Sequence, residues 1–197
     1  TADLSAVVRP RTLPLVTRYE RADGPVHLWT TFSADQVDLD YRNPEVLLAV
    51  LDVLLRYRAA GASAIRLDAI ALIWKVEGSS SINLDETHDI IEILRSWLDE
   101  VDPGLLLVTE TNVPHAENVA YLGRPGRREA QAVYQFALPP LLLHTLRTGD
   151  PTALVGWASS LTALPPGLTY LNFTSSHDGV GVRPWEGILG AGEVAAL

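Results

Sequence analysis

Three short segments of the sequence carry acidic residues in or near apolar runs. They are Arg66-Leu67-Asp68, Thr109-Glu110-Thr111 and His177-Asp178. Cleavage of a glycosidic bond needs two carboxylates in different environments, because one protonates the leaving oxygen while the other attacks or polarises from the opposite face. We therefore interpret Asp68, Glu110 and Asp178 as candidates for glycosidic bond chemistry.

The first segment has the surroundings that a nucleophile needs. Side chains two residues apart in an extended chain point the same way, so Arg66 and Asp68 share one side while Leu67 packs on the other. A neighbouring guanidinium favours the ionised form of a carboxylate and orients it, as attack on an anomeric carbon requires. Glu110 is expected at the equivalent height on a neighbouring strand, as a candidate general acid/base.

Each of these residues also has a purely structural interpretation. An Asp or Glu just past a strand is often the N-cap of the next helix. Arg66 with Asp68 can be an ordinary ion pair, and His177 can be a loop histidine without a role. Three carboxylates expected at one end of a sheet favour the chemical interpretation.

The elements that must position these residues alternate along the chain. The expected strands are residues 64–70, 105–109, 131–136 and 168–173, and the expected helices are residues 44–60, 87–101, 140–147 and 151–163. Such alternation through short loops predicts a parallel sheet with right-handed crossovers, either doubly wound or closed as a barrel. Because no glycine-rich phosphate loop follows any strand, the barrel is favoured.

The ends of two helices and one buried face can also be predicted. Asn43 and Pro44 supply an N-cap and a first helical residue, and Gly61 stops that helix. The buried face of the helix over residues 87–101 is expected to comprise Ile90, Ile91, Ile93, Leu94, Trp97 and Leu98. In parallel sheets functional side chains project from the carboxyl ends of the strands, where the candidate carboxylates lie.

The first 42 residues have a different sequence pattern from the rest. Asp23-Gly24 is a turn signal between residues 17–19 and 27–30, which predicts a β-hairpin. We interpret residues 1–42 as the end of a small β-rich insertion domain and residues 43–197 as a partial catalytic (β/α) barrel.

Bulk composition excludes several classes of function. Fifteen Lys and Arg against 24 Asp and Glu give a net charge of −9, so no basic face is expected for nucleic acid. No stretch approaches the roughly 20 apolar residues of a membrane helix, and the start lacks the layout of a secretory signal. The chain has no Cys, which fits a cytoplasmic location, and its lack of any Met suggests a piece of a longer product.

Metal binding is not predicted, and two aromatic residues are candidates for sugar stacking. The histidines lie at spacings that match no metal template, and no cofactor is expected. Trp74 and Phe136 are the favoured stacking residues, although aromatic side chains on such elements more often pack in the core.

The three acidic segments resemble signatures of a known family. Ile65 to Ala69, Val108 to Asn112 and Ser176 to Asp178 resemble three signature segments of glycoside hydrolase family 13, and Gln36 to Asp40 looks like a further one. More narrowly, Trp29 to Phe32, Ile70 to Lys75, Thr111 to Asn118 and Phe136 to Pro140 are similar to the sucrose phosphorylase branch, whose members with glucosylglycerate or sucrose 6-phosphate as substrate look most alike.

The resemblance implies a retaining double displacement in a TIM barrel, with a sugar substrate and inorganic phosphate as small-molecule partners. It implies that Asp68 forms a covalent glucosyl intermediate, that Glu110 protonates the leaving oxygen and that Asp178 stabilises the transition state. Arg66 and His177 match residues that brace the nucleophile and the glucosyl hydroxyls. A retaining mechanism places the carboxyl groups of Asp68 and Glu110 about 5–5.5 Å apart.

The resemblance covers only about barrel strands four to seven. The family's Asp-Asn-His signature of the third strand has no counterpart here, and residues 79–85 differ from the usual sequence of the branch. The exposed edges of a partial barrel predict association. Two alternatives remain open: an α-glucosidase or amylase-like hydrolase, and an inactive fragment or sugar-binding remnant.

Overall fold

The computed structural model describes residues 3–181 and 183–195. The chain divides into two compact units. The first unit comprises Thr1–Arg56 and Ala71–Thr87, and the second comprises Tyr57–Ile70 and His88–Leu197. None of the helices in the described part of the chain has the length and apolarity needed to cross a membrane.

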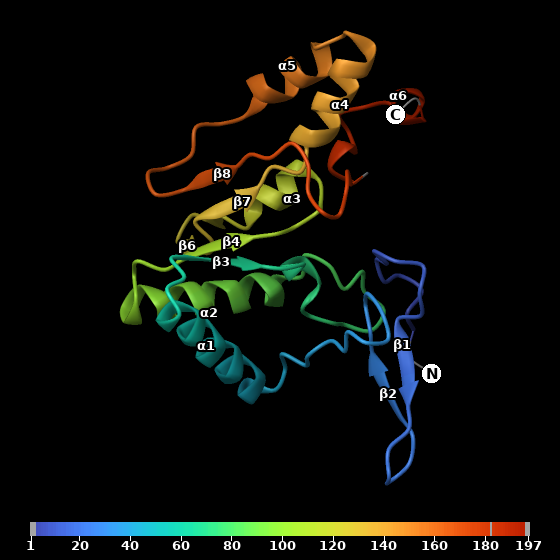
Figure 1. The fold of residues 1–197 in the computed structure, drawn as a ribbon, viewed down its shortest axis with the longest axis vertical. Coiled ribbons are helices and arrows are strands. Elements are labelled where there is room, and N and C mark those ends of the chain that lie inside the picture. Colours follow the sequence, from blue (N-terminus) through green and yellow to red (C-terminus); the bar gives the residue numbers. More distant parts are fainter. Residues whose placement is uncertain (1–2, 182, 196–197) are drawn as a thin grey trace. The chain divides into compact units, whose positions relative to one another are not determined.

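The first unit contains the predicted β-hairpin (Figure 1). Strand β1 (Val16–Tyr19) pairs antiparallel with β2 (Val26–Trp29), and Val16 lies opposite Trp29. Gly24 in the connecting turn has a φ of 115°, a backbone conformation that glycine adopts without steric cost. The hairpin predicted from the Asp23-Gly24 signal is therefore confirmed.

A half-buried ion pair fixes residues 71–87 of the first unit to the segment that follows the hairpin. Lys75 Nζ lies 2.7 Å from Asp38 Oδ2 and donates a hydrogen bond of 2.9 Å to Thr31 Oγ1. Burial lowers the pKa of Lys75, while its contact with Asp38 opposes that shift. Asp38 also accepts a hydrogen bond from the Thr31 amide at 2.9 Å, so the pair is well satisfied.

The second unit is built on a parallel sheet of four strands, in the order β3-β4-β7-β8 (Figure 1). The strands are β3 (Ala64–Leu67), β4 (Leu106–Thr109), β7 (Ala132–Tyr134) and β8 (Thr169–Leu171). All three pairings are parallel, so each strand lies beside its predecessor as in part of a barrel. The sheet is open in the described chain, and the predicted partial α/β barrel is confirmed.

The helices agree with the sequence prediction and include short ones that it missed. The long helices are α1 (Pro44–Ala59), α2 (Asp85–Val101), α4 (Leu138–Thr148) and α5 (Thr152–Ser160). The further elements are η1 (Ile70–Leu72), α3 (His115–Ala120), β5 (Gly123–Arg124), β6 (Arg127–Arg128), η2 (Arg183–Trp185) and α6 (Ala191–Ala195).

The buried face of α2 is narrower than predicted. Four of its residues are buried as expected, namely Ile90, Ile91, Leu94 and Leu98. Ile93 is 46% exposed, so its predicted burial is wrong, and Trp97 is half-buried. Each helical residue turns by about 100°, which places Ile93 well outside the stripe centred on Ile91 and Leu94. Ile93 and Trp97 instead line an open hollow with Asp89, Glu92 and Ser96.

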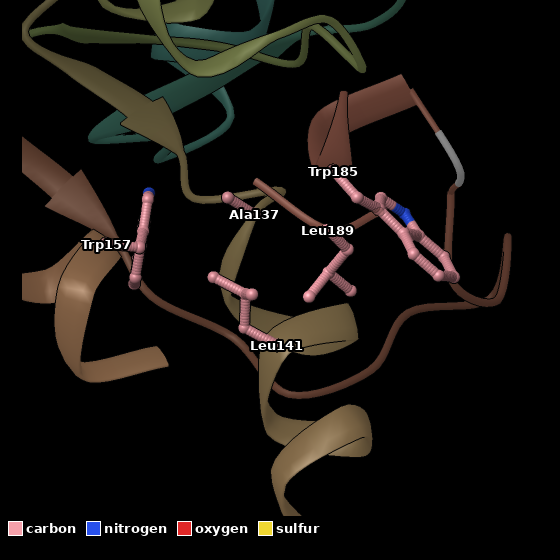
Figure 2. Close-up of a cluster of buried hydrophobic side chains, with 5 residues drawn as sticks. All are labelled: Ala137, Leu141, Trp157, Trp185 and Leu189. Carbon is pink, nitrogen blue, oxygen red and sulfur yellow. The ribbon is translucent and has the colours of Figure 1, made fainter. Parts of the chain in front are cut away.

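A second apolar cluster anchors the chain that follows β8 (Figure 2). Ala137 and Leu141 come from the start of α4, Trp157 from α5, and Trp185 and Leu189 from the segment after the Asp178 loop. Trp185 and Leu189 pack against this cluster from that segment, and burial of a large apolar side chain contributes roughly 1.5–3 kcal/mol. The loop that carries Asp178 is therefore held at both ends, by β8 and by Trp185.

Candidate active site

Asp68 comes directly after β3. The strand ends at Leu67, and Ala69 then takes a left-handed conformation with a φ of 46° before η1 begins. Asp68 Oδ1 lies 2.7 Å from Nη1 of Arg66, and the Asp68 side chain is 71% exposed. The carboxylate is thus oriented by a cation and remains open to an incoming molecule.

Glu110 occupies the matching place on the neighbouring strand. Its amide donates to the Leu67 carbonyl at 3.0 Å, which extends the ladder between β3 and β4 by one bond. Its Oε2 accepts a hydrogen bond of 2.9 Å from the Ala69 amide, and its Oε1 lies 3.6 Å from Nη2 of Arg66. A positive φ is costly for a residue with a side chain, and at Ala69 it accompanies the bond that holds Glu110.

The environment of Glu110 raises the pKa of its carboxyl group. Its side chain is only 12% exposed, and this burial is the main cause that raises its pKa. The Ala69 amide and the Arg66 guanidinium lower the pKa, whereas the negative charges of Asp68 and Asp178 raise it further. Both other carboxylates therefore lie near enough to Glu110 for their charges to act on it.

Asp178 lies in the loop between β8 and η2. Its amide donates to Ser176 Oγ at 3.3 Å, and its Oδ2 lies 3.2 Å from Nε2 of His177. The side chains of His177 and Asp178 are 76% and 47% exposed. A Cβ added to Gly181 would overlap the side chain of Asn112, so the loop packs closely against the residues that follow Glu110.

Aromatic residues at the end of β7 and just after β7 and β8 form a cluster beside Arg66. Tyr134, Phe136 and Phe173 contact one another with ring centroids between 5.2 and 5.8 Å apart. The Arg66 guanidinium lies over the Tyr134 ring, 5.7 Å from its centroid, which is a favourable cation–π distance. Phe136 is buried within this group, while Tyr134 is half-buried.

Trp74 belongs to the first unit. There the guanidinium of Arg42 lies over its ring at 5.7 Å, and the ring is half-buried. Its expected role in sugar binding stays a prediction. All six other expected site residues belong to the second unit, namely Arg66, Asp68, Glu110, Phe136, His177 and Asp178.

Sequence reasoning did not identify several residues that hold this arrangement. Thr111 and Asn118 are buried and hydrogen-bonded to each other, and Ala69 is the amide donor to Glu110. A positive φ cannot be read from an alanine in a sequence. Asn118 lies in α3, a six-residue helix with three polar residues whose pattern gave no signal.

The geometry separates two carboxylates into different chemical states. Asp68 is exposed and paired with a cation, whereas Glu110 is largely buried and its pKa is raised. Such a pair provides one group for nucleophilic attack and one for proton donation. No group of three or more His, Cys, Asp or Glu side chains suited to a metal occurs among residues 3–181 and 183–195.

Two characterised enzymes are similar to this chain in sequence. The glucosylglycerate phosphorylase of Escherichia coli strain K12 is 53% identical over 196 residues, which is 99% of this chain and 35% of that protein. The sucrose phosphorylase of Agrobacterium vitis is 34% identical over 184 residues, 91% of this chain and 35% of that protein. This chain thus spans about a third of the length of these relatives.

A solved structure has the same fold. The sucrose 6F-phosphate phosphorylase from Thermoanaerobacter thermosaccharolyticum matches 98% of this chain and 38% of its own, with a TM-score of 0.82 at 22% identity. The model of the alpha amylase catalytic domain matches residues 19–154. The chain therefore belongs to the alpha-amylase family, glycoside hydrolase family 13, and carries part of its catalytic domain.

Proposed function

We propose that this chain is the part of a retaining α-glucoside phosphorylase that carries the carboxylates Asp68, Glu110 and Asp178. The enzyme transfers a glucosyl group from sucrose, sucrose 6-phosphate or glucosylglycerate to inorganic phosphate. Among these donors we favour glucosylglycerate, because the relative at 53% identity is a glucosylglycerate phosphorylase. The small-molecule substrate proposed for this chain and the absence of Cys from its sequence support a cytoplasmic location.

The proposed reaction has two displacements. In the first, a carboxylate oxygen of Asp68 forms a bond to the anomeric carbon while the bond to the leaving oxygen breaks, and Glu110 donates its proton to that oxygen. In the second, a phosphate oxygen attacks the anomeric carbon of the glucosyl ester, Glu110 takes the phosphate proton, and Asp68 leaves as the free carboxylate. The negative charge of Asp178 stabilises the positive charge that develops on the sugar ring in both steps.

One observation carries this proposal. A single guanidinium, that of Arg66, contacts both Asp68 and Glu110, while Asp68 is exposed and burial raises the pKa of Glu110. A general acid must hold a proton near neutral pH, whereas the nucleophile must be ionised. We expect the two carboxyl groups to lie about 5–5.5 Å apart when a sugar is bound.

The test follows glucose 1-phosphate in the natural-length protein. We expect it to form from glucosylglycerate only when phosphate is supplied. Release of free glucose at the same rate without phosphate would contradict the proposal and indicate a hydrolase.

Two substitutions separate the roles of the carboxylates. Asp68→Asn should abolish turnover of every donor, because no covalent ester can form. Glu110→Gln should lose turnover of glucosylglycerate by roughly 10²–10⁴-fold. It should retain formation of the glucosyl ester from glucosyl fluoride, whose leaving group needs no proton. Equal loss with both donors would contradict the acid role of Glu110.

A further inference from the structure

We propose that Asn118 is a positioning residue, whose side chain ties the segment after Glu110 to the strand that carries Tyr134. Asn118 has no chemical step in the proposed reaction. The inference depends on the proposed function only in its effect on turnover, since the geometry of Glu110 can be measured in an inactive protein.

The need for such a tie arises where the sheet ladder stops. Strands β4 and β7 pair through Val108 with Ala132 and Thr109 with Val133, and the pairing ends there. Glu110 follows Thr109 directly, so the backbone that carries it lies one residue beyond the last pair with β7. Beyond that pair, the backbone segments that continue β4 and β7 need other hydrogen bonds to keep their spacing.

Asn118 supplies these bonds from α3. Its Oδ1 accepts a short hydrogen bond from Thr111 Oγ1, and its Nδ2 donates a hydrogen bond of 2.7 Å to the Tyr134 carbonyl. Both side chains are buried, with exposed fractions of 2% for Asn118 and 1% for Thr111. Hydrogen bonds in such a site are worth more than at the surface, and loss of one leaves a buried group unpaired.

The two bonds act on both sides of the candidate site. Thr111 is the neighbour of Glu110, whose side chain is held by Ala69 and Arg66. Tyr134 carries the ring over which the Arg66 guanidinium lies. Asn118 therefore fixes the spacing between the backbone of the buried acid and the residue that orients its cation.

The chain offers a matched control at the opposite end of the same strand pair. Gln131 precedes β7, and its Oε1 accepts a hydrogen bond of 2.8 Å from the amide of Leu107 in β4. It is also a side-chain amide that joins these two strands. It lies at their amino ends, away from the carboxylates.

The experiment measures the pKa of Glu110 directly in the natural-length protein by carbon-13 NMR titration, with the Glu110→Gln spectrum identifying its signal. In Asn118→Ala we expect the pKa of Glu110 to fall toward its ordinary value, because a loosened segment exposes the carboxyl to water. In Gln131→Ala the pKa should stay raised, although both variants lose stability.

Turnover gives a second readout. We expect kcat of Asn118→Ala to fall roughly tenfold to a hundredfold, the scale of a small misplacement of reacting groups, while Gln131→Ala keeps the kcat of the wild type per folded molecule. The basic limb of the pH–rate profile should move to lower pH only in Asn118→Ala. If the wild type shows no transfer to phosphate, the proposed function fails while the NMR titration still tests the positioning.

A conservative pair of variants covers the case in which Asn118→Ala does not fold. Thr111→Val removes one of the two bonds, and Thr111→Ser restores the hydroxyl. The titration of Glu110 should change in the valine variant and return in the serine variant. A pKa of Glu110 that stays as in the wild type in folded Asn118→Ala and Thr111→Val, or that falls equally in Gln131→Ala, would overturn the inference.

Discussion

Glu110 is held between interactions that favour opposite protonation states. Burial and the charges of Asp68 and Asp178 favour its neutral form, while the Ala69 amide and Arg66 favour the carboxylate. Burial is the largest of these effects, and the pKa is raised overall. A residue tuned in this way is suited to exchange a proton, but it does so at a cost in stability.

We expect Glu110→Gln to stabilise the protein at neutral pH. A carboxyl whose pKa is higher in the folded state contributes stability that is fully present below its unfolded pKa and is lost as pH rises through the folded value. Glutamine cannot ionise and keeps an oxygen for the Ala69 amide. The free energy of unfolding of Glu110→Gln should therefore exceed that of the wild type near pH 7.

Urea unfolding at several pH values measures this difference, which should shrink toward pH 4. Glu100→Gln provides the control, because it removes a carboxyl group that is exposed to solvent on the same chain. A wild type that is more stable than Glu110→Gln at pH 7 would show that Arg66 and Ala69 outweigh burial.

At the scale of elements, the β5–β6 hairpin shows how a glycine can be required for two different reasons. Gly123 and Gly126 both have positive φ, at 98° and 83°. A Cβ on Gly126 would meet open space, whereas a Cβ on Gly123 would overlap the carbonyl oxygen of Arg127. Arg127 in turn pairs with Asp89 and Glu92 of α2, so the hairpin is docked on that helix.

We therefore expect very different costs for alanine at these two sites. Gly126→Ala should lower the free energy of unfolding by only the backbone strain of a left-handed residue, about 1 kcal/mol. Gly123→Ala must also move the Arg127 backbone and weaken its pairing with α2, for a total of roughly 3 kcal/mol. Thermal and urea unfolding of the two variants, side by side, measures the difference. Equal losses would mean that the hairpin shifts freely on α2.

Sequence patterns predicted the elements whose signals are local. Apolar runs located all four strands of the parallel sheet, and Pro44 and Gly61 bracketed the first long helix. The strand expected over residues 64–70 ends at Leu67. The Ala69 amide donates its hydrogen bond to the side chain of Glu110, 41 residues further along the chain, instead of to a neighbouring strand. Contacts of that kind are set by tertiary structure and leave no periodic trace.

The sequence likewise predicted only part of the candidate site. The carboxylates were predicted because strand ends in a parallel sheet converge. Asn118, the Tyr134 ring over which Arg66 lies and the left-handed Ala69 were not, since each depends on which side chains meet after folding. The predicted burial of Ile93 was wrong for a geometric reason, because its position on the helix lies well outside the stripe centred on Ile91 and Leu94.

At the scale of the whole molecule, the described sheet ends at β3 and β8, and both strands are incompletely covered. Leu171 in β8 is 40% exposed, and Ala64 and Thr169 are exposed as well. Unpaired edges of this kind are templates for strand pairing with another chain. The solved structure with the same fold has more than twice the length matched here.

We expect the 197-residue chain, produced alone, to associate through these edges. Sedimentation velocity should show a weight-average mass that rises with concentration. A charge on an edge strand opposes strand addition, so Leu171→Lys should shift this association to higher concentration.

Leu146 provides the control. It lies on α4 and is 83% exposed, more than Leu171, but a helix offers no unpaired strand edge. If association is driven by exposed apolar area instead of strand edges, Leu146→Lys will reduce it more than Leu171→Lys does. A chain that is monomeric at all concentrations and unfolds cooperatively would show that neither edge is available.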